Sequence, residues 1–84
     1  MKVIKFRQDA CPQCDQMDQM LEAMGLLDKA EVVHITDDNR NEITAQFNVF
    51  GTPTLIKLNE EGNEVARVTR LSFGEIEELF DEIA

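Results

Sequence analysis

The spacing of hydrophobic and polar residues changes repeatedly along the chain, and each change predicts an element of secondary structure. Short runs rich in β-branched residues, or alternating apolar and polar residues, indicate strands. Apolar residues three and four positions apart, with charged residues between them, indicate amphipathic helices. The expected strands span residues 2–6, 31–35, 54–58 and 64–69, and the expected helices span 11–25, 42–47 and 72–83.

The order of these elements constrains their connections. A strand, a helix and a second strand form a βαβ unit, so we expect the first two strands to be parallel with a right-handed crossover. The polar cluster at residues 59–63 predicts a turn that joins the last two strands as an antiparallel hairpin. Ser72 and Glu75 match a capping box at the start of the last helix. A chain of 84 residues has room for one domain, so we expect a single domain over residues 1–84.

The charge balance narrows the set of partners. Lys and Arg total 8 against 17 Asp and Glu, which gives a formal net charge of −9. Such a protein repels phosphate backbones and anionic membrane surfaces, so neither nucleic acid nor membrane is an expected partner. The first seven residues are interrupted too often by charge to form a signal peptide, and no apolar run approaches about 18 residues. We therefore expect a cytoplasmic protein.

The only two cysteines, Cys11 and Cys14, lie where the first strand meets the first helix. The first sulfur of such a pair sits among unpaired N–H groups at the positive end of the helix dipole, where a thiolate is favoured. Pro12 suits the first helical position, which needs no N–H. Cys14 lies one turn further along the same side. We expect Cys11 to be the exposed nucleophile and Cys14 to attack a mixed disulfide on Cys11.

Two other interpretations of the cysteine pair are weaker. A structural zinc site needs four ligands, whereas the chain offers two cysteines and one histidine, His34, so only a site shared between chains would be complete. We therefore expect no metal. In a reducing compartment the pair is more typical of catalysis than of a structural crosslink, and closing so short a loop contributes only about 2 kcal/mol.

Acidic residues surround the expected nucleophile. Asp9 precedes the pair, and Asp15 and Asp18 fall on the polar face of the helix, so all three oppose the effect of the helix dipole on Cys11. Arg7 offsets part of this charge. The direction in which the Cys11 thiol titration is displaced is therefore left open by the sequence.

Two motifs at compatible spacing give the chain a family resemblance. Cys11-Pro12-Gln13-Cys14 follows the first strand, and Gly51-Thr52-Pro53-Thr54 precedes the third. Along its whole length the chain resembles the thioredoxin and glutaredoxin superfamily in its minimal form. The resemblance implies an α/β fold of order β-α-β-α-β-β-α, with a central four-stranded mixed sheet flanked by helices.

The resemblance also implies the make-up of the substrate site. In that fold a cis-proline loop lies beside the cysteine pair, so Thr52–Pro53 would be cis and Thr52 would present its backbone to a substrate chain. Pro53 would occupy the position from which a metal could otherwise reach the thiols. Substrate contacts are expected from Pro12, Gln13, Gly51, Thr52 and Pro53. Because unrelated X–Pro bonds are cis in only about 5–6% of cases, the cis assignment rests on the resemblance.

The chain departs from the thioredoxin pattern behind the cysteines. Thioredoxins carry a buried acid on the first strand that assists proton transfer at the second cysteine, and Lys5 stands at that position. The position of their neighbouring-strand lysine is occupied by His34. One hypothesis is that Lys5 and His34 form a modified proton-handling pair with neutral His34 as the base. The alternative is that His34 is a partly exposed strand residue and Lys5 reaches solvent.

The resemblance implies a thiol–disulfide oxidoreductase that would reduce protein disulfides through a Cys11–Cys14 cycle. No bound cofactor is expected beyond the redox-active disulfide, and electrons would come from NADPH through a thioredoxin-reductase-type flavoprotein. Substrates would be disulfide-containing proteins, with ribonucleotide reductase among the candidates, and the protein is expected to be a monomer.

Two alternatives remain. One is a glutaredoxin-like, glutathione-coupled reductase, although Gln13 replaces the usual aromatic residue and the last helix lacks a Gly-Gly pair. The other is a partner-binding scaffold with little redox role.

Overall fold

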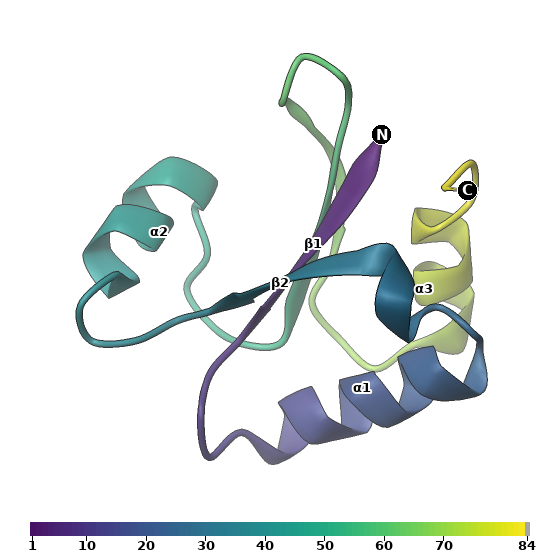
Figure 1. Ribbon diagram of the computed structural model, residues 1–84, viewed down its shortest axis with the longest axis horizontal. Coiled ribbons are helices and arrows are strands. Elements are labelled where there is room, and N and C mark those ends of the chain that lie inside the picture. Colours follow the sequence, from purple (N-terminus) through teal and green to yellow (C-terminus); the bar gives the residue numbers. More distant parts are fainter. Residues whose placement is uncertain (84) are drawn as a thin grey trace.

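A central sheet with helices on both faces forms the molecule (Figure 1). The structure is a computed structural model and describes residues 1–83. In these residues no helix is both long enough and apolar enough to cross a membrane. In chain order the elements are β1 (Lys2–Arg7), α1 (Pro12–Ala23), the 3-10 helix η1 (Leu27–Lys29), β2 (Ala30–His34), α2 (Arg40–Phe47), β3 (Thr54–Leu58), β4 (Glu64–Val68) and α3 (Phe73–Leu79).

The sheet has the strand order β2-β1-β3-β4, with β1 in the interior. β1 pairs in parallel with β2 and antiparallel with β3, and β3 pairs antiparallel with β4. The predicted parallel pair, the predicted hairpin and the mixed four-stranded sheet are therefore confirmed. Because β1 is interior, the loop that leaves its carboxyl end carries the cysteines to one end of the sheet.

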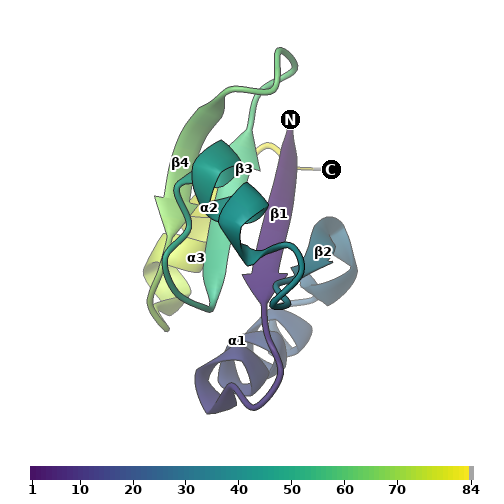
Figure 2. The same cartoon turned by 90° about the vertical axis from the view of Figure 1, so that its left-hand side faces the viewer.

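The helices cover both faces of the sheet, and a separate hydrophobic core lies between each face and its helices (Figure 2). Successive strand residues point to opposite faces, so Val3 joins one core while Ile4 and Phe6 join the other. α1 and α3 cover the first core and α2 covers the second. The first core contains Val3, Met17, Leu21, Leu55, Val68, Ile76, Leu79 and Phe80, and the second contains Ile4, Phe6, Ile35, Ile43, Val49, Ile56 and Leu58.

The last helix is shorter than the sequence predicts. α3 ends at Leu79, and Glu82 has a φ of 72°, a left-handed conformation that cannot continue a right-handed helix. The Nζ of the buried Lys57 donates a 2.9 Å hydrogen bond to the Asp81 carbonyl, which ties the segment after α3 to the sheet.

The capping box at the start of α3 is only half formed. The Oγ of Ser72 accepts from the Glu75 N–H at 3.3 Å, as the sequence predicts. The Glu75 carboxylate instead accepts from the Arg70 Nε at 2.5 Å. Ser72 therefore caps the helix without the reciprocal contact from Glu75.

Arg67 on β4 braces the end of α2, where the chain turns toward the second sequence motif. Asn48 ends the helix with a φ of 58°, and the Arg67 guanidinium donates to the carbonyls of Phe47 at 2.8 Å and Asn48 at 3.1 Å. Glu64 holds the guanidinium at 2.6 Å. The hydrogen bond from Arg67 lowers the pKa of Glu64, and the same contact raises the pKa of Arg67. This brace fixes the start of the segment that leads to Gly51.

Candidate active site

The two cysteines are joined by a disulfide at the start of α1, with their Cα atoms 5.2 Å apart. Ala10, in a left-handed conformation with a φ of 54°, turns the chain from the β1 side into the helix. Cys11 is the N-cap, and its Sγ accepts from the Cys14 N–H at 3.1 Å, while its carbonyl accepts from the N–H groups of Cys14 and Asp15. A helix N–H group thus points at the Cys11 sulfur, an arrangement that favours a thiolate.

Both cysteines are buried, and for Cys11 this differs from the sequence prediction. Cys11 is 8% exposed and Cys14 is 1% exposed. The expectation of an exposed Cys11 is wrong in degree, because Thr52 contacts its sulfur, but Cys11 is the more accessible of the two. A partner molecule that approaches the disulfide therefore reaches Cys11 first.

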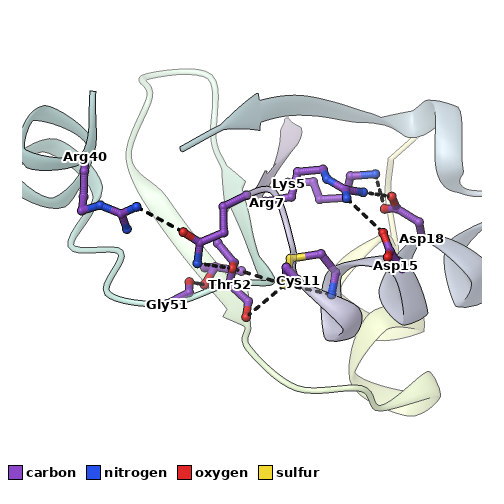
Figure 3. The surroundings of a disulfide bond; sticks show 11 residues. Lys5, Arg7, Cys11, Asp15, Asp18, Arg40, Gly51 and Thr52 are labelled. Atoms are coloured by element: carbon purple, nitrogen blue, oxygen red, sulfur yellow. Dashed lines mark hydrogen bonds and ion pairs between the residues drawn. A yellow bond between two sulfur atoms is a disulfide. The ribbon is translucent and has the colours of Figure 1, made fainter. Parts of the chain in front are cut away.

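The segment before β3 lies directly against Cys11 (Figure 3). The Thr52–Pro53 peptide bond is cis. The Oγ1 of Thr52 lies 3.5 Å from the Cys11 Sγ, and the Thr52 carbonyl oxygen lies 3.9 Å from it. Thr54 pins the segment through a 2.8 Å hydrogen bond from its hydroxyl to the Gly51 carbonyl. The structure therefore brings the two sequence motifs together although they are far apart in the chain.

The other residues expected to contact substrate lie around the contact between Thr52 and the Cys11 sulfur. Pro12 and Gln13 are exposed in the first turn of α1, Gly51 is exposed beside Thr52, and Pro53 is buried. Phe50, next to Gly51, is 81% exposed, which is unusual for a large apolar side chain. Cavities lie on both sides of Thr52, and Phe50, Gly51 and Thr52 line both of them.

Lys5 and His34 do not form the pair that the sequence suggests. The parallel register places Val32 opposite Lys5 and Arg7 opposite His34. Lys5 is 3% exposed and does not reach solvent, whereas His34 is exposed. A proton-handling role for His34 stays a prediction that no described contact supports.

Lys5 instead joins an ion-pair cluster, formed by Lys5, Arg7, Asp15 and Asp18, that covers the start of α1 on one side of Cys11 (Figure 3). The Nζ of Lys5 lies 2.5 Å from the Asp18 Oδ1, and Arg7 pairs with both Asp18 and Asp15, the latter at 3.0 Å. The hydrogen bond to Asp15 is the largest cause that raises the pKa of Arg7.

Asp18 is predicted from the sequence to lie on the polar face of the helix, yet its carboxylate turns toward the sheet. The available signal was its spacing of four residues from Cys14, which puts both on one helix face.

On the other side of Cys11, three polar side chains form a continuous chain of hydrogen bonds (Figure 3). Arg40 Nη2 donates to Gln8 Oε1 at 3.3 Å, and Gln8 Nε2 donates to Thr52 Oγ1 at 2.8 Å. We call Arg40, Gln8 and Thr52 the relay. Gln8 and Arg40 were not predicted as site residues, because nothing in their local spacing indicates that they meet.

Within residues 1–83, no group of three or more His, Cys, Asp or Glu side chains is placed to hold a metal ion. The chemistry that the arrangement supports is thiol–disulfide exchange at Cys11 and Cys14.

Comparisons with known proteins identify the family of the chain. No protein-family model matches the chain. Over 83 residues the chain is 32% identical to the SPbeta prophage-derived thioredoxin-like protein YosR of Bacillus subtilis strain 168, and the match covers 99% of each chain.

Solved structures show the same fold. Thioredoxin 1 of Thermosipho africanus TCF52B is 26% identical with a TM-score of 0.69, covering 98% of this chain and 92% of that one. Thioredoxin NaTrxh of Nicotiana alata is 27% identical with a TM-score of 0.70, covering 96% of this chain and 70% of that one. Given this likeness and the full-length match to a thioredoxin-like relative, the chain belongs to the family of thioredoxin-like proteins.

Proposed function

We propose that this protein is a thiol–disulfide oxidoreductase that reduces protein disulfides. The observation that carries the proposal is the Cys11–Cys14 disulfide at a helix N-terminus, with Thr52 in contact with the outer sulfur. In the reduced protein the Cys11 thiolate attacks one sulfur of a substrate disulfide. The substrate S–S bond breaks, a mixed disulfide forms, and the leaving substrate sulfur takes up a proton.

Cys14 completes the reaction. Its thiolate attacks the Cys11 sulfur, the mixed disulfide breaks, and the second substrate sulfur leaves as a thiol after protonation. The substrate gains two electrons, and the protein loses two as the Cys11–Cys14 bridge forms. The 1% exposure of Cys14 supports this order, because a substrate cannot reach its sulfur before that of Cys11.

The surface around Thr52 supports docking of an extended protein segment. Gly51 has open space around its Cα, so a substrate backbone can approach the segment closely. The exposed Phe50 ring offers an apolar contact on one side, and Pro12 and Gln13 offer contacts on the other. Docking would place a substrate sulfur against Cys11, while the Thr52 backbone binds the flanking residues.

The cycle needs an external reductant. We assign NADPH, acting through a thioredoxin-reductase-type flavoprotein, as the source of electrons, and disulfide-containing proteins such as ribonucleotide reductase as the substrate class. The protein would act in the cytoplasm as a monomer. Asp15 and Asp18 are paired with Lys5 and Arg7, but Asp9 beside the cysteines and the net charge of −9 still oppose the approach of an anionic tripeptide, which supports a flavoprotein over glutathione as donor.

Trapping tests the two-step mechanism directly. Cys14→Ser should accumulate mixed disulfides between Cys11 and a model protein disulfide, visible by non-reducing electrophoresis and intact mass. Cys11→Ser should trap nothing and should fail to reduce the same substrate. If Cys14→Ser traps no substrate while an alkylating reagent still labels Cys11, the mechanism is wrong.

The donor is tested by supplying each reductant alone. With NADPH and a thioredoxin reductase, the wild-type protein should turn over a model protein disulfide repeatedly. With glutathione alone, turnover should be much slower. Faster turnover with glutathione would assign the protein to the glutaredoxin-like alternative.

A further inference from the structure

The relay ends at the nucleophilic sulfur and begins on a different face of the sheet. Arg40 opens α2, Gln8 follows β1, and Thr52 precedes β3, so three separate segments meet in it. The distances from Arg40 to Gln8, from Gln8 to Thr52, and from Thr52 to the Cys11 Sγ are 3.3, 2.8 and 3.5 Å. Each distance is within hydrogen-bonding reach, and the longest involves sulfur, whose larger radius permits a longer hydrogen bond.

The chemistry of the groups fixes the direction of every link. A guanidinium has only donors, so the atom of Gln8 that faces Arg40 must be the amide oxygen. The amide nitrogen of Gln8 must then face Thr52 and donate to its hydroxyl oxygen. That hydroxyl has a single hydrogen, and it is free to point at the Cys11 sulfur.

We propose that Gln8 and Arg40 are positioning residues that make the Thr52 hydroxyl a hydrogen-bond donor to the Cys11 thiolate. The inference rests on the proposed function, in which this thiolate is the attacking group. Without Gln8, the Thr52 hydroxyl could turn its hydrogen elsewhere, and the sulfur would lose a donor. The relay therefore favours the thiolate over the thiol.

The hydrogen bond depends on the state of the sulfur. A disulfide sulfur carries no hydrogen and is a weak acceptor, whereas a thiolate is charged and accepts strongly. In the reduced protein the Cys11 thiolate would accept from the Thr52 hydroxyl at 3.5 Å and from the Cys14 N–H at 3.1 Å. The Thr52 carbonyl, at 3.9 Å, could only accept a hydrogen from the protonated thiol. The shorter contact of the hydroxyl therefore favours the charged form.

Charged groups around Cys11 do not replace this effect. The ion-pair cluster holds equal numbers of cations and anions, so its charges largely cancel at the sulfur. Asp9 disfavours the thiolate and the Arg40 guanidinium favours it, while Asp37 pairs with Arg40 at 3.7 Å on its exposed side. The charged groups that face the site are Lys5, Arg7, Asp9, Asp15, Asp18 and Arg40.

Titration of a single thiol tests the proposal. In a Cys14→Ser background Cys11 is the only thiol, and the chain has no Tyr or Trp, so the ultraviolet thiolate absorbance reports Cys11 alone. Thr52→Val keeps the branched shape without the hydroxyl, and should raise the midpoint of the Cys11 titration by about half to one pH unit. Thr52→Ser keeps the hydroxyl and should restore most of the wild-type midpoint.

Gln8→Glu gives the sharper test, because a carboxylate keeps the shape of the side chain but can only accept. It would take the Thr52 hydrogen away from the sulfur, and its charge would also oppose the thiolate. Measuring Gln8→Glu in two backgrounds, one with Thr52 intact and one carrying Thr52→Val, separates these two effects. The second background has no hydroxyl at this position, so only the charge effect survives there. We expect a larger upward shift where Thr52 is intact.

Control variants show whether a shift in the Cys11 titration midpoint comes from the relay. Glu42→Gln removes an exposed carboxylate of α2 outside the relay and should leave the midpoint unchanged, whereas Arg40→Gln should raise it. Equal shifts for Gln8→Glu in both backgrounds, or no shift for Thr52→Val, would overturn the relay. The trapping of substrate by Cys14→Ser is a separate measurement, so the oxidoreductase can stand if the relay fails, and the relay can stand if trapping fails.

Discussion

The Nζ of Lys5 lies 2.5 Å from the Oδ1 of Asp18, so a cation with a carboxylate partner stands where the thioredoxin pattern has a buried acid. The strand supplies a cation, and the carboxylate comes from α1, one turn after Cys14. The Lys5 side chain is 4% exposed and that of Asp18 is 25% exposed, so the ammonium depends on this partner far more than the carboxylate does.

Removing the carboxylate should therefore destabilise the protein. Asp18→Asn leaves the Lys5 ammonium buried without its anion, and we expect a loss of about 2 to 3 kcal/mol in the free energy of unfolding, near the lower end for a broken buried pair because Asp18 is partly hydrated. Urea unfolding of the reduced protein measures this. A Lys5→Met, Asp18→Leu double variant should recover much of the loss, and a fully stable Asp18→Asn would contradict the dependence of Lys5 on Asp18.

His34 should be dispensable for proton transfer. Its side chain is exposed, and its register partner on β1 is Arg7 rather than Lys5. His34→Ala should leave the pH dependence of disulfide reduction unchanged, measured as the rate against a model protein disulfide across neutral pH. A lost or displaced inflection in that profile would restore the hypothesis that His34 handles protons.

The contact between Glu64 and Arg67 predicts a pH dependence of stability. Arg67 lowers the folded-state pKa of Glu64 below its ordinary value of 4.5, so the contact stabilises the fold above that value and is lost as pH falls through the lowered pKa. Because the Glu64 side chain is 38% exposed, Glu64→Gln should cost only about 0.5 to 1 kcal/mol at neutral pH.

The difference between wild type and Glu64→Gln should then shrink toward zero in acid. Unfolding free energies measured by denaturant titration at neutral and acidic pH give this comparison. Glu60→Gln, in the exposed turn after β3, is the matched control and should show little difference at either pH. If Glu64→Gln lowers the free energy of unfolding by the same amount at both pH values, the contact between Glu64 and Arg67 is not ionic in origin.

Phe50 offers a test that separates docking from chemistry. Because its side chain is 81% exposed, Phe50→Ala should change the unfolding free energy by less than about 0.5 kcal/mol. It should slow reduction of a protein disulfide while leaving reduction of a small disulfide compound nearly unchanged, since only the larger substrate reaches the ring. Equal slowing of both substrates would place Phe50 outside the docking surface.

The sequence predicts the elements and the cysteine pair well because both depend on local patterns. Apolar spacing locates the strands around Ile4 and Ile56, and the position of Cys11 before Pro12 identifies a helix start. The predicted end of α3 was wrong, because the apolar spacing continues to Ile83 whereas the helical backbone ends at Leu79 and Glu82 is left-handed.

The same limit explains which site residues were missed. Asp18 has the spacing of a polar surface residue. Its carboxylate turns toward the sheet because it pairs with Lys5 on β1, and this contact forms only when α1 packs against the sheet. Gln8 and Arg40 meet only after α2 packs onto its face of the sheet. Local periodicity does not predict side-chain contacts between separate elements. Thr52 and Pro53 were predicted because the second motif resembles the cis-proline loop of the thioredoxin superfamily.

The pairing of the Lys and Arg side chains affects how the protein attracts other molecules. Most of the positive side chains form ion pairs or hydrogen bonds with other groups of the protein, both at the surface and in the interior, while carboxylates such as Glu22, Glu42 and Glu77 lie exposed on the helices. Because each ion pair also cancels one carboxylate, an approaching partner meets the net charge of −9 as a surface dominated by carboxylates. Partners with a basic docking face should be drawn in by long-range attraction, and their association should slow steeply as ionic strength rises. The engaged cations are Lys2, Lys5, Arg7, Arg40, Lys57, Arg67 and Arg70.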